Sequence, residues 1–166
     1  MFNKRILSML MVVLLALGAF AGFAVAEDKE IVIGIAPKMV GAPYWDYANQ
    51  GCMKAGEALG ITVNLQASTT ASAQEQAAII DNFITLGVDA IVVAANDEST
   101  LLPVLNRASE AGIPIVTYDS DVPASQRLYC VASCGQIELG EMMAKELVNV
   151  MGEEGEVAFM TGSLSA

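Results

Sequence analysis

The sequence predicts an α/β protein built on an open, doubly wound parallel β-sheet. Two observations lead to this fold class. Short, continuous apolar runs of strand length alternate with longer segments of helical periodicity. Three of those helical segments also end at a glycine shortly before the next apolar run, at Gly60, Gly87 and Gly112. Strands separated by single helices pair in parallel through right-handed crossovers, and such strands are apolar throughout because both of their faces are covered.

The first half of the chain contains two strand–helix units. Residues 31–36 (IVIGIA) form the first predicted strand, and residues 43–59 form a helix that ends at Gly60. Residues 62–66 form a short strand with two β-branched side chains. The next helix opens with a capping box at Ser72-Ala73-Gln74-Glu75, where the hydroxyl and the carboxylate satisfy free backbone N–H groups.

The second half continues the alternation. We expect strands at residues 90–94, 114–118 and 128–132, and a helix at residues 100–111 with Pro103 tolerated near its first turn. Residues 133–136 (SCGQ) resemble a second capping box and predict a helix that runs to Val150. A last strand is predicted at residues 156–161 (EVAFMT).

The first 26 residues have the three parts of a secretory signal peptide. Lys4 and Arg5 precede an apolar run over residues 6–25, and the segment closes with the small-residue motif Ala24-Val25-Ala26. A membrane anchor is the alternative, because the run is nearly long enough to span a bilayer. The closing motif favours cleavage after Ala26, which predicts a periplasmic protein with no stable membrane insertion after cleavage.

Charge and composition exclude several classes of function. After cleavage, 140 residues would remain, with 6 basic and 19 acidic residues and a net charge of −13. Such a surface repels nucleic acid. The chain has no histidine and three cysteines, so histidine-dependent nucleophilic catalysis and a zinc site are not expected. No glycine-rich phosphate loop follows the first strand, so we predict no dinucleotide cofactor and no metal.

Polar and aromatic side chains gather in the loops that follow the predicted strands. In open parallel sheets, ligands bind outside the carboxyl ends of the strands. Those loops contain a cation, two aromatic rings, an amide and two carboxylates, which are Lys38, Tyr44, Trp45, Asn96, Asp119 and Asp121. Aromatic faces pack against sugar C–H groups, and carboxylates accept hydrogen bonds from hydroxyls. The set therefore predicts a site for a polyol.

Each of these residues also has a purely structural alternative. Tyr44 and Trp45 suit a helix start that is anchored to the core, and Asn96 suits an Asx turn. Asp119 suits a turn cap, and Lys38 suits an ordinary solvated position. The placement of all six at one edge of the sheet is what favours a binding site.

Several segments together resemble the type I periplasmic sugar-binding proteins of ABC transporters. These segments are IVIGIAPKMVGAPYW, GITVNLQAS, QEQAAIIDNFITLGVDAIVVAANDES, AGIPIVTYDSDVP and GEVAFMTG. The loops PKMVGAPYW and TYDSD are similar to those of the branch that binds rhamnose and the furanose signal autoinducer-2. The resemblance implies that Lys38 and Asp119 contact the ligand, that Tyr44 and Trp45 flank it, and that Asp121 lies beside them.

The resemblance also implies a domain organisation. Members of this family are longer proteins with two lobes. The predicted signal peptide covers residues 1–26, a sugar-binding lobe covers residues 27–133, and residues 134–166 would begin a second lobe. Most of that second lobe is missing, so we expect a chain truncated after the first lobe.

Three functions are compatible with these observations. The leading hypothesis is a non-enzymatic binding component of an ABC transporter that delivers a monosaccharide or furanose to its permease. A receptor that passes a bound ligand to a membrane sensor would use the same site. A secreted carbohydrate hydrolase using Asp97 and Asp119 is the third, but the sequence offers it no histidine and no isolated buried carboxylate.

Overall fold

The computed structural model describes residues 29–160, and residues 1–28 and 161–166 lie outside this description. The predicted signal peptide and its cleavage site therefore fall outside the described residues. Within them lie five strands and four helices, which alternate along the chain except that no helix separates the fourth strand from the fifth. No helix in this part of the chain is long and apolar enough to span a membrane.

The five strands form one parallel sheet in the order β2-β1-β3-β4-β5. The strands are β1 (Val32–Ala36), β2 (Thr62–Leu65), β3 (Ala90–Val93), β4 (Ile115–Tyr118) and β5 (Tyr129–Val131). Every neighbouring pair is parallel. The strand order reverses direction at β1, so this is the doubly wound sheet that the alternating pattern predicts.

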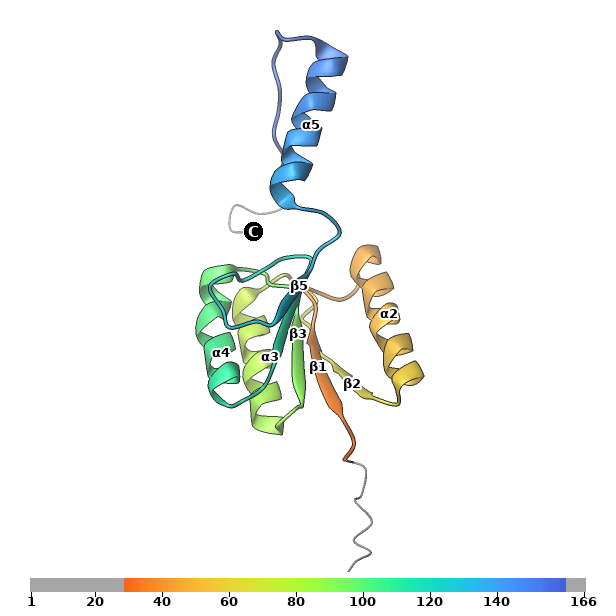
Figure 1. Ribbon diagram of the computed structural model, residues 1–166, viewed down its shortest axis with the longest axis vertical. Coiled ribbons are helices and arrows are strands. Elements are labelled where there is room, and N and C mark those ends of the chain that lie inside the picture. Colours follow the sequence, from red (N-terminus) through yellow and green to blue (C-terminus); the bar gives the residue numbers. More distant parts are fainter. Residues whose placement is uncertain (1–28, 161–166) are drawn as a thin grey trace, which may run out of the picture. The chain divides into compact units, whose positions relative to one another are not determined.

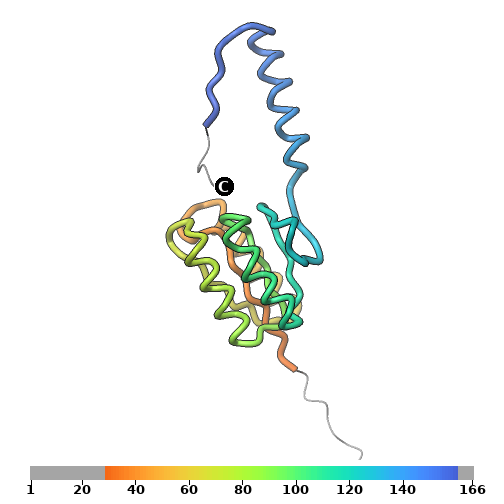
Figure 2. The backbone as a smooth tube through the Cα atoms, turned by 90° about the vertical axis from the view of Figure 1, so that its left-hand side faces the viewer, coloured from red at the N-terminus to blue at the C-terminus, as the bar shows by residue number. Residues whose placement is uncertain are grey.

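Three helices cover the two faces of this sheet. Helices α3 (Ala73–Leu86) and α4 (Glu98–Glu110) pack against each other on one face, whereas α2 (Pro43–Leu59) lies on the other (Figure 1). Figure 2 shows α3 and α4 running side by side along the sheet. The fourth helix is α5 (Gln136–Met151), in which no residue is buried.

The hydrophobic core lies between the sheet and the α3–α4 pair. Its fully buried members include Ile80, Phe83, Ile91, Val93, Leu101, Leu105 and Ile115. Gly34 of β1 allows α3 to approach closely, because a Cβ atom at this position would lie 2.7 Å from the ring of Phe83. The apolar periodicity of the sequence therefore determines which face of each helix packs against which face of the sheet.

Most predicted elements are present, with ends that differ by one or two residues. Ser72 is the N-cap of α3, and its hydroxyl accepts a hydrogen bond from the Glu75 N–H at 3.2 Å. Helix α4 begins at Glu98, before the predicted residue 100, because the Asp97 carboxylate caps it. Strands end where ladder pairing ends, and sequence pattern alone does not mark that point.

Two local predictions near the C-terminal end were wrong. The predicted capping box at residues 133–136 does not form, because the N-cap of α5 is Gly135 and no side chain caps it. Residues 156–160 form no strand. A strand needs a neighbour for its backbone groups, and the described sheet ends at β5 with no strand beyond it.

Candidate functional site

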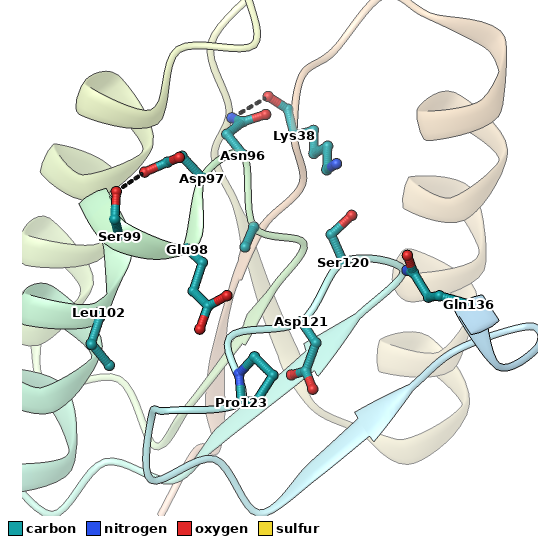
Figure 3. Close-up of a pocket in the computed structure, with 11 residues that line it drawn as sticks. Lys38, Asn96, Asp97, Glu98, Ser99, Leu102, Ser120, Asp121, Pro123 and Gln136 are labelled. Atoms are coloured by element: carbon teal, nitrogen blue, oxygen red, sulfur yellow. Dashed lines mark hydrogen bonds between the residues drawn. The ribbon is translucent and has the colours of Figure 1, made fainter. Parts of the chain in front are cut away.

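A cavity of about 750 Å³ opens at the carboxyl edge of the sheet. Its walls come from the loops that follow β1, β3 and β4 and from the first turns of α4 and α5 (Figure 3). The polar side chains around it are Lys38, Asn96, Asp97, Glu98, Ser99, Ser120, Asp121 and Gln136. Its volume lies within the range of small-molecule pockets, and the topological rule for parallel sheets predicted this position.

Asn96 ties the loop after β3 to the loop after β1. Its side-chain Nδ2 donates a hydrogen bond to the Lys38 carbonyl oxygen at 3.0 Å. The residue is only 8% exposed. The Lys38 main chain is therefore held in place while its side chain lies at the cavity wall. Asn96 is thus a bridge between loops that also contributes to the cavity lining.

Gln76 of α3 is buried beneath these loops. It bonds to the main chain at the ends of both β1 and β3. Gln76 was not among the residues predicted from the sequence to form the site. One signal was available, because Gln76 is a polar residue on the helix face that carries Ala73, Ile80 and Phe83, and a buried polar side chain requires a specific partner.

Asp119 follows β4 in an uncommon backbone conformation. Its φ angle is +60°, the left-handed region, which non-glycine residues seldom adopt outside functional or turn positions. Its carboxylate accepts hydrogen bonds from the Tyr44 hydroxyl at 2.7 Å and from the Ser120 hydroxyl at 2.9 Å. The hydrogen bond to Asp119 raises the pKa of Tyr44. Asp119 is therefore oriented by two hydroxyl groups.

Trp45 lies in the interface between α2 and the end of β4. It is 9% exposed, and its ring makes edge-on contacts with Tyr44 at 4.8 Å and with Tyr118 at 6.1 Å between centroids. The Tyr118 hydroxyl is buried without a hydrogen-bond partner, and burial raises the pKa of Tyr118. Trp45 thus makes the contacts expected of its structural alternative, a helix start that is anchored to the core. Tyr44 is the more exposed of the two rings.

Asp121 forms an ion pair within its own loop. Its carboxylate oxygens accept hydrogen bonds from Arg127 Nε at 2.5 Å and Nη2 at 2.6 Å, and from the Val122 N–H at 2.8 Å. The Thr117 hydroxyl is a further donor. These hydrogen bonds, those from Arg127 above all, lower the pKa of Asp121 to about 2. Asp121 lines the cavity, but the hydrogen bonds named above use most of the acceptor positions of its carboxylate and stabilise its own loop.

Asp97 caps helix α4 and is not placed as a general acid. Its carboxylate accepts hydrogen bonds from the Thr100 N–H and from the Ser99 hydroxyl, both at 2.7 Å. These bonds lower the pKa of Asp97. A general acid for glycoside hydrolysis needs a raised pKa, so this geometry does not favour the hydrolase hypothesis. Among the described residues, no group of three potential metal ligands lies close together.

The structure divides the six predicted site residues into two neighbouring groups. Lys38, Asn96 and Asp121 line the cavity. Tyr44, Trp45 and Asp119 form a connected cluster around the end of β4 and the start of α2. Glu98, Ser120 and Gln136 also line the cavity and were not predicted from the sequence.

The fold and this cavity define a class of protein, the ligand-binding α/β lobe with its site at the carboxyl edge of a parallel sheet. The family model for the periplasmic binding protein domain matches residues 33–166. The chain therefore belongs to the periplasmic binding proteins, and its relatives have the type I fold and bind sugars.

Three similar proteins illustrate this relationship. The multiple sugar-binding periplasmic receptor ChvE of Rhizobium radiobacter is 28% identical, over 90% of this chain and 42% of its own length. An ABC transporter solute-binding protein of Burkholderia graminis, solved with D-arabinose, has a TM-score of 0.77 and 30% identity, covering 82% of this chain and 47% of that one.

The third is LsrB of Clostridium saccharobutylicum, solved with AI-2. It has a TM-score of 0.66 and 27% identity, covering 77% of this chain and 40% of that one. This chain thus spans less than half the length of each of the three proteins.

Proposed function

We propose that this protein is the extracytoplasmic solute-binding component of an ABC transporter, and that it binds a monosaccharide or a related furanose. The observation that carries the proposal is the cavity at the carboxyl edge of the sheet, with Lys38, Asn96 and Ser120 on its walls. A cation, an amide and a hydroxyl offer donors and acceptors to a ligand with several hydroxyl groups. Membership of a family with sugar-binding relatives supports the same conclusion.

The proposed ligand site combines the two groups of residues. Lys38, Asn96 and Asp121 line the cavity, and the Asp119 carboxylate lies in the loop beside it, already oriented by Tyr44 and Ser120. An oriented carboxylate accepts hydrogen bonds from sugar hydroxyls without a large loss of side-chain entropy. Tyr44 is 60% exposed, so its ring is available to a sugar face, with Trp45 supporting it from behind.

The ligand class follows from this chemistry and from the relatives. One similar structure contains D-arabinose and another contains AI-2. We propose rhamnose, a ribose-like pentose or autoinducer-2 as candidates for this chain, consistent with the PKMVGAPYW and TYDSD loops. We propose no cofactor and no enzymatic role, and the lowered pKa of Asp97 argues against a hydrolase that would use it as a general acid.

The proposed organisation and location follow the same family. Residues 1–26 would direct export to the periplasm, residues 27–133 would form the sugar-binding lobe, and residues 134–166 would begin a second lobe. The partners would be the sugar and the permease subunits in the inner membrane. N-terminal sequencing of exported protein should find Glu27 first, and Met1 in that material would contradict the export proposal.

Isothermal titration calorimetry with L-rhamnose, D-ribose, D-arabinose and autoinducer-2 tests the proposed function. For the sugar that binds, Asp119→Ala and Lys38→Ala should each weaken affinity by roughly tenfold to over a hundredfold. This range corresponds to about 1–3 kcal/mol for unpaired buried groups. Glu110→Ala, at the exposed end of α4, is the control and should change nothing. Unchanged affinity in both site variants would mean that this edge of the sheet is not the site.

A further inference from the structure

Gln76 joins two separate stretches of main chain at the carboxyl edge of the sheet. Its Nε2 group donates to the carbonyl oxygens of Ala36 at 3.1 Å, Pro37 at 3.1 Å and Ala94 at 2.8 Å. Its Oε1 atom accepts a hydrogen bond from the Asn96 N–H at 2.9 Å. The residue is 2% exposed. Both ends of its amide group are therefore used, and neither end meets solvent.

The position of these bonds matters more than their number. The backbone ladder between β1 and β3 ends with the Ala94 N–H bonded to the Ala36 carbonyl at 3.1 Å. Beyond that point the two chains separate into the loops that carry Lys38 and Asn96. The amide of Gln76 lies at this divergence and supplies the bonds that the ladder no longer makes. It thereby fixes the spacing of the two loops where they leave the sheet.

The hydrogen-bond network of Gln76 also includes residues that line the cavity. Gln76 holds the Asn96 main chain, and the Asn96 side chain holds the Lys38 carbonyl. Gln76 also holds the Pro37 carbonyl, one residue before Lys38. Two cavity residues are thus positioned by one side chain that does not itself line the cavity.

We propose that Gln76 is a positioning residue, which sets the geometry of Lys38 and Asn96 and through them the affinity of the site. The predicted effect of Gln76 on affinity rests on the proposed sugar-binding function, whereas its predicted effect on the loop positions does not. Glutamine suits this place because it carries an N–H₂ donor and a carbonyl acceptor on one planar group. An apolar side chain would leave several main-chain groups without partners.

Gln76→Glu is the sharpest test, since it keeps the shape and the acceptor but removes the N–H₂ donor. Its carboxylate would face three carbonyl oxygens, which raises its pKa, as does burial. On acidification it takes up a proton and regains one O–H donor. Gln74→Glu is the matched control, because Gln74 is exposed on the same helix. The nearby charged groups (Lys38, Asp97 and Glu75) are shared by both variants.

Two measurements are made on each variant of the full chain. Hydrogen exchange at the Ala94 amide, which bonds to the Ala36 carbonyl where the ladder ends, should be at least tenfold faster in Gln76→Glu at pH 7.5, with little change at the amides of β2. Affinity for D-arabinose, measured by calorimetry, should fall about tenfold at pH 7.5 and recover at pH 5. Gln74→Glu should match the parent chain in both.

The possible outcomes separate this inference from the proposed function. Unchanged Ala94 exchange in a folded Gln76→Glu variant overturns the inference. Faster exchange throughout the sheet, with an affinity loss that does not recover at pH 5, also overturns it, because it shows general destabilisation. If the parent chain binds none of the four ligands tested above, the proposed function fails, and the exchange at Ala94 still decides whether Gln76 positions the loops.

Discussion

Two regions of this protein have similar apolar patterns but very different surroundings. In residues 31–130, helices α3 and α4 bury one face against the sheet, and Ile80, Leu101 and Leu105 are fully inaccessible. In residues 131–160, every residue is exposed, including apolar residues of α5 such as Ile137 at 75% and Val150 at 83%. Both regions form helices where periodicity predicts them.

The difference shows that a helical pattern and a packed helix are separate properties. Periodicity states which face of a helix is apolar, but the partner for that face must come from elsewhere in the fold. For α3 and α4 the partner is the sheet, whereas no residue of α5 is buried. The sheet region should therefore carry nearly all of the stability of this chain, and the following predictions test that division.

The largest effect is expected from matched leucine truncations. Leu101→Ala, in the core between α4 and the sheet, should lower the free energy of unfolding by about 2–5 kcal/mol, because it removes buried area and leaves a cavity. Leu147→Ala, in α5 where the side chain is 43% exposed, should change it by less than about 0.5 kcal/mol. Urea denaturation followed by circular dichroism measures both. Similar losses in the two variants would show that α5 is packed in solution.

An intermediate effect is expected from acid. The pKa of Asp121 is lowered to about 2 in the folded chain, so its ion pair stabilises the fold above pH 4 and this stability is lost as the pH falls towards 2. Both partners are about a quarter exposed, which limits the contribution to roughly 1–2 kcal/mol. Asp121→Asn should flatten the dependence of unfolding free energy on pH between 4 and 2.

The control for this prediction lies in the other region. Glu141→Gln, in the exposed helix α5, removes one negative charge without disturbing the loop after β4. It should leave the acid dependence as it is in the parent chain. A flattening of equal size in Glu141→Gln would attribute the effect to net charge and not to the Asp121–Arg127 pair.

The smallest effect is expected at the helix starts. Ser72 caps α3 through its hydroxyl, so Ser72→Ala should lower the free energy of unfolding by about 1 kcal/mol. Ser133 does not cap α5, whose N-cap is Gly135, so Ser133→Ala should have no measurable effect. Thermal unfolding of the two variants tests these expectations. An equal loss of stability in both variants would indicate that the capping box predicted at residues 133–136 does form in solution.

Several features of the site could be predicted because they depend on topology. The carboxyl ends of parallel strands lie at one edge, so Lys38, Asn96 and Asp121 were expected together, and they line one cavity. The roles within the site were less accessible. Asp121 accepts two hydrogen bonds from Arg127, six residues further along the chain, and Trp45 of α2 packs edge-on against Tyr118. The sequence shows that a residue lies on a loop, but it does not show which hydrogen-bond donor contacts its side chain in the folded protein.

The sequence by itself determined the order of the elements from β1 to α5, the start of α3 at Ser72 and the parallel sheet, because these depend on local periodicity, capping and chain connectivity. The tertiary structure decided the rest. It placed Gln76 beneath two loops that lie far from it in sequence, and it left residues 156–160 without a strand to pair with. Both outcomes depend on which backbone groups from distant segments come within hydrogen-bonding distance, and only the folded chain sets those distances.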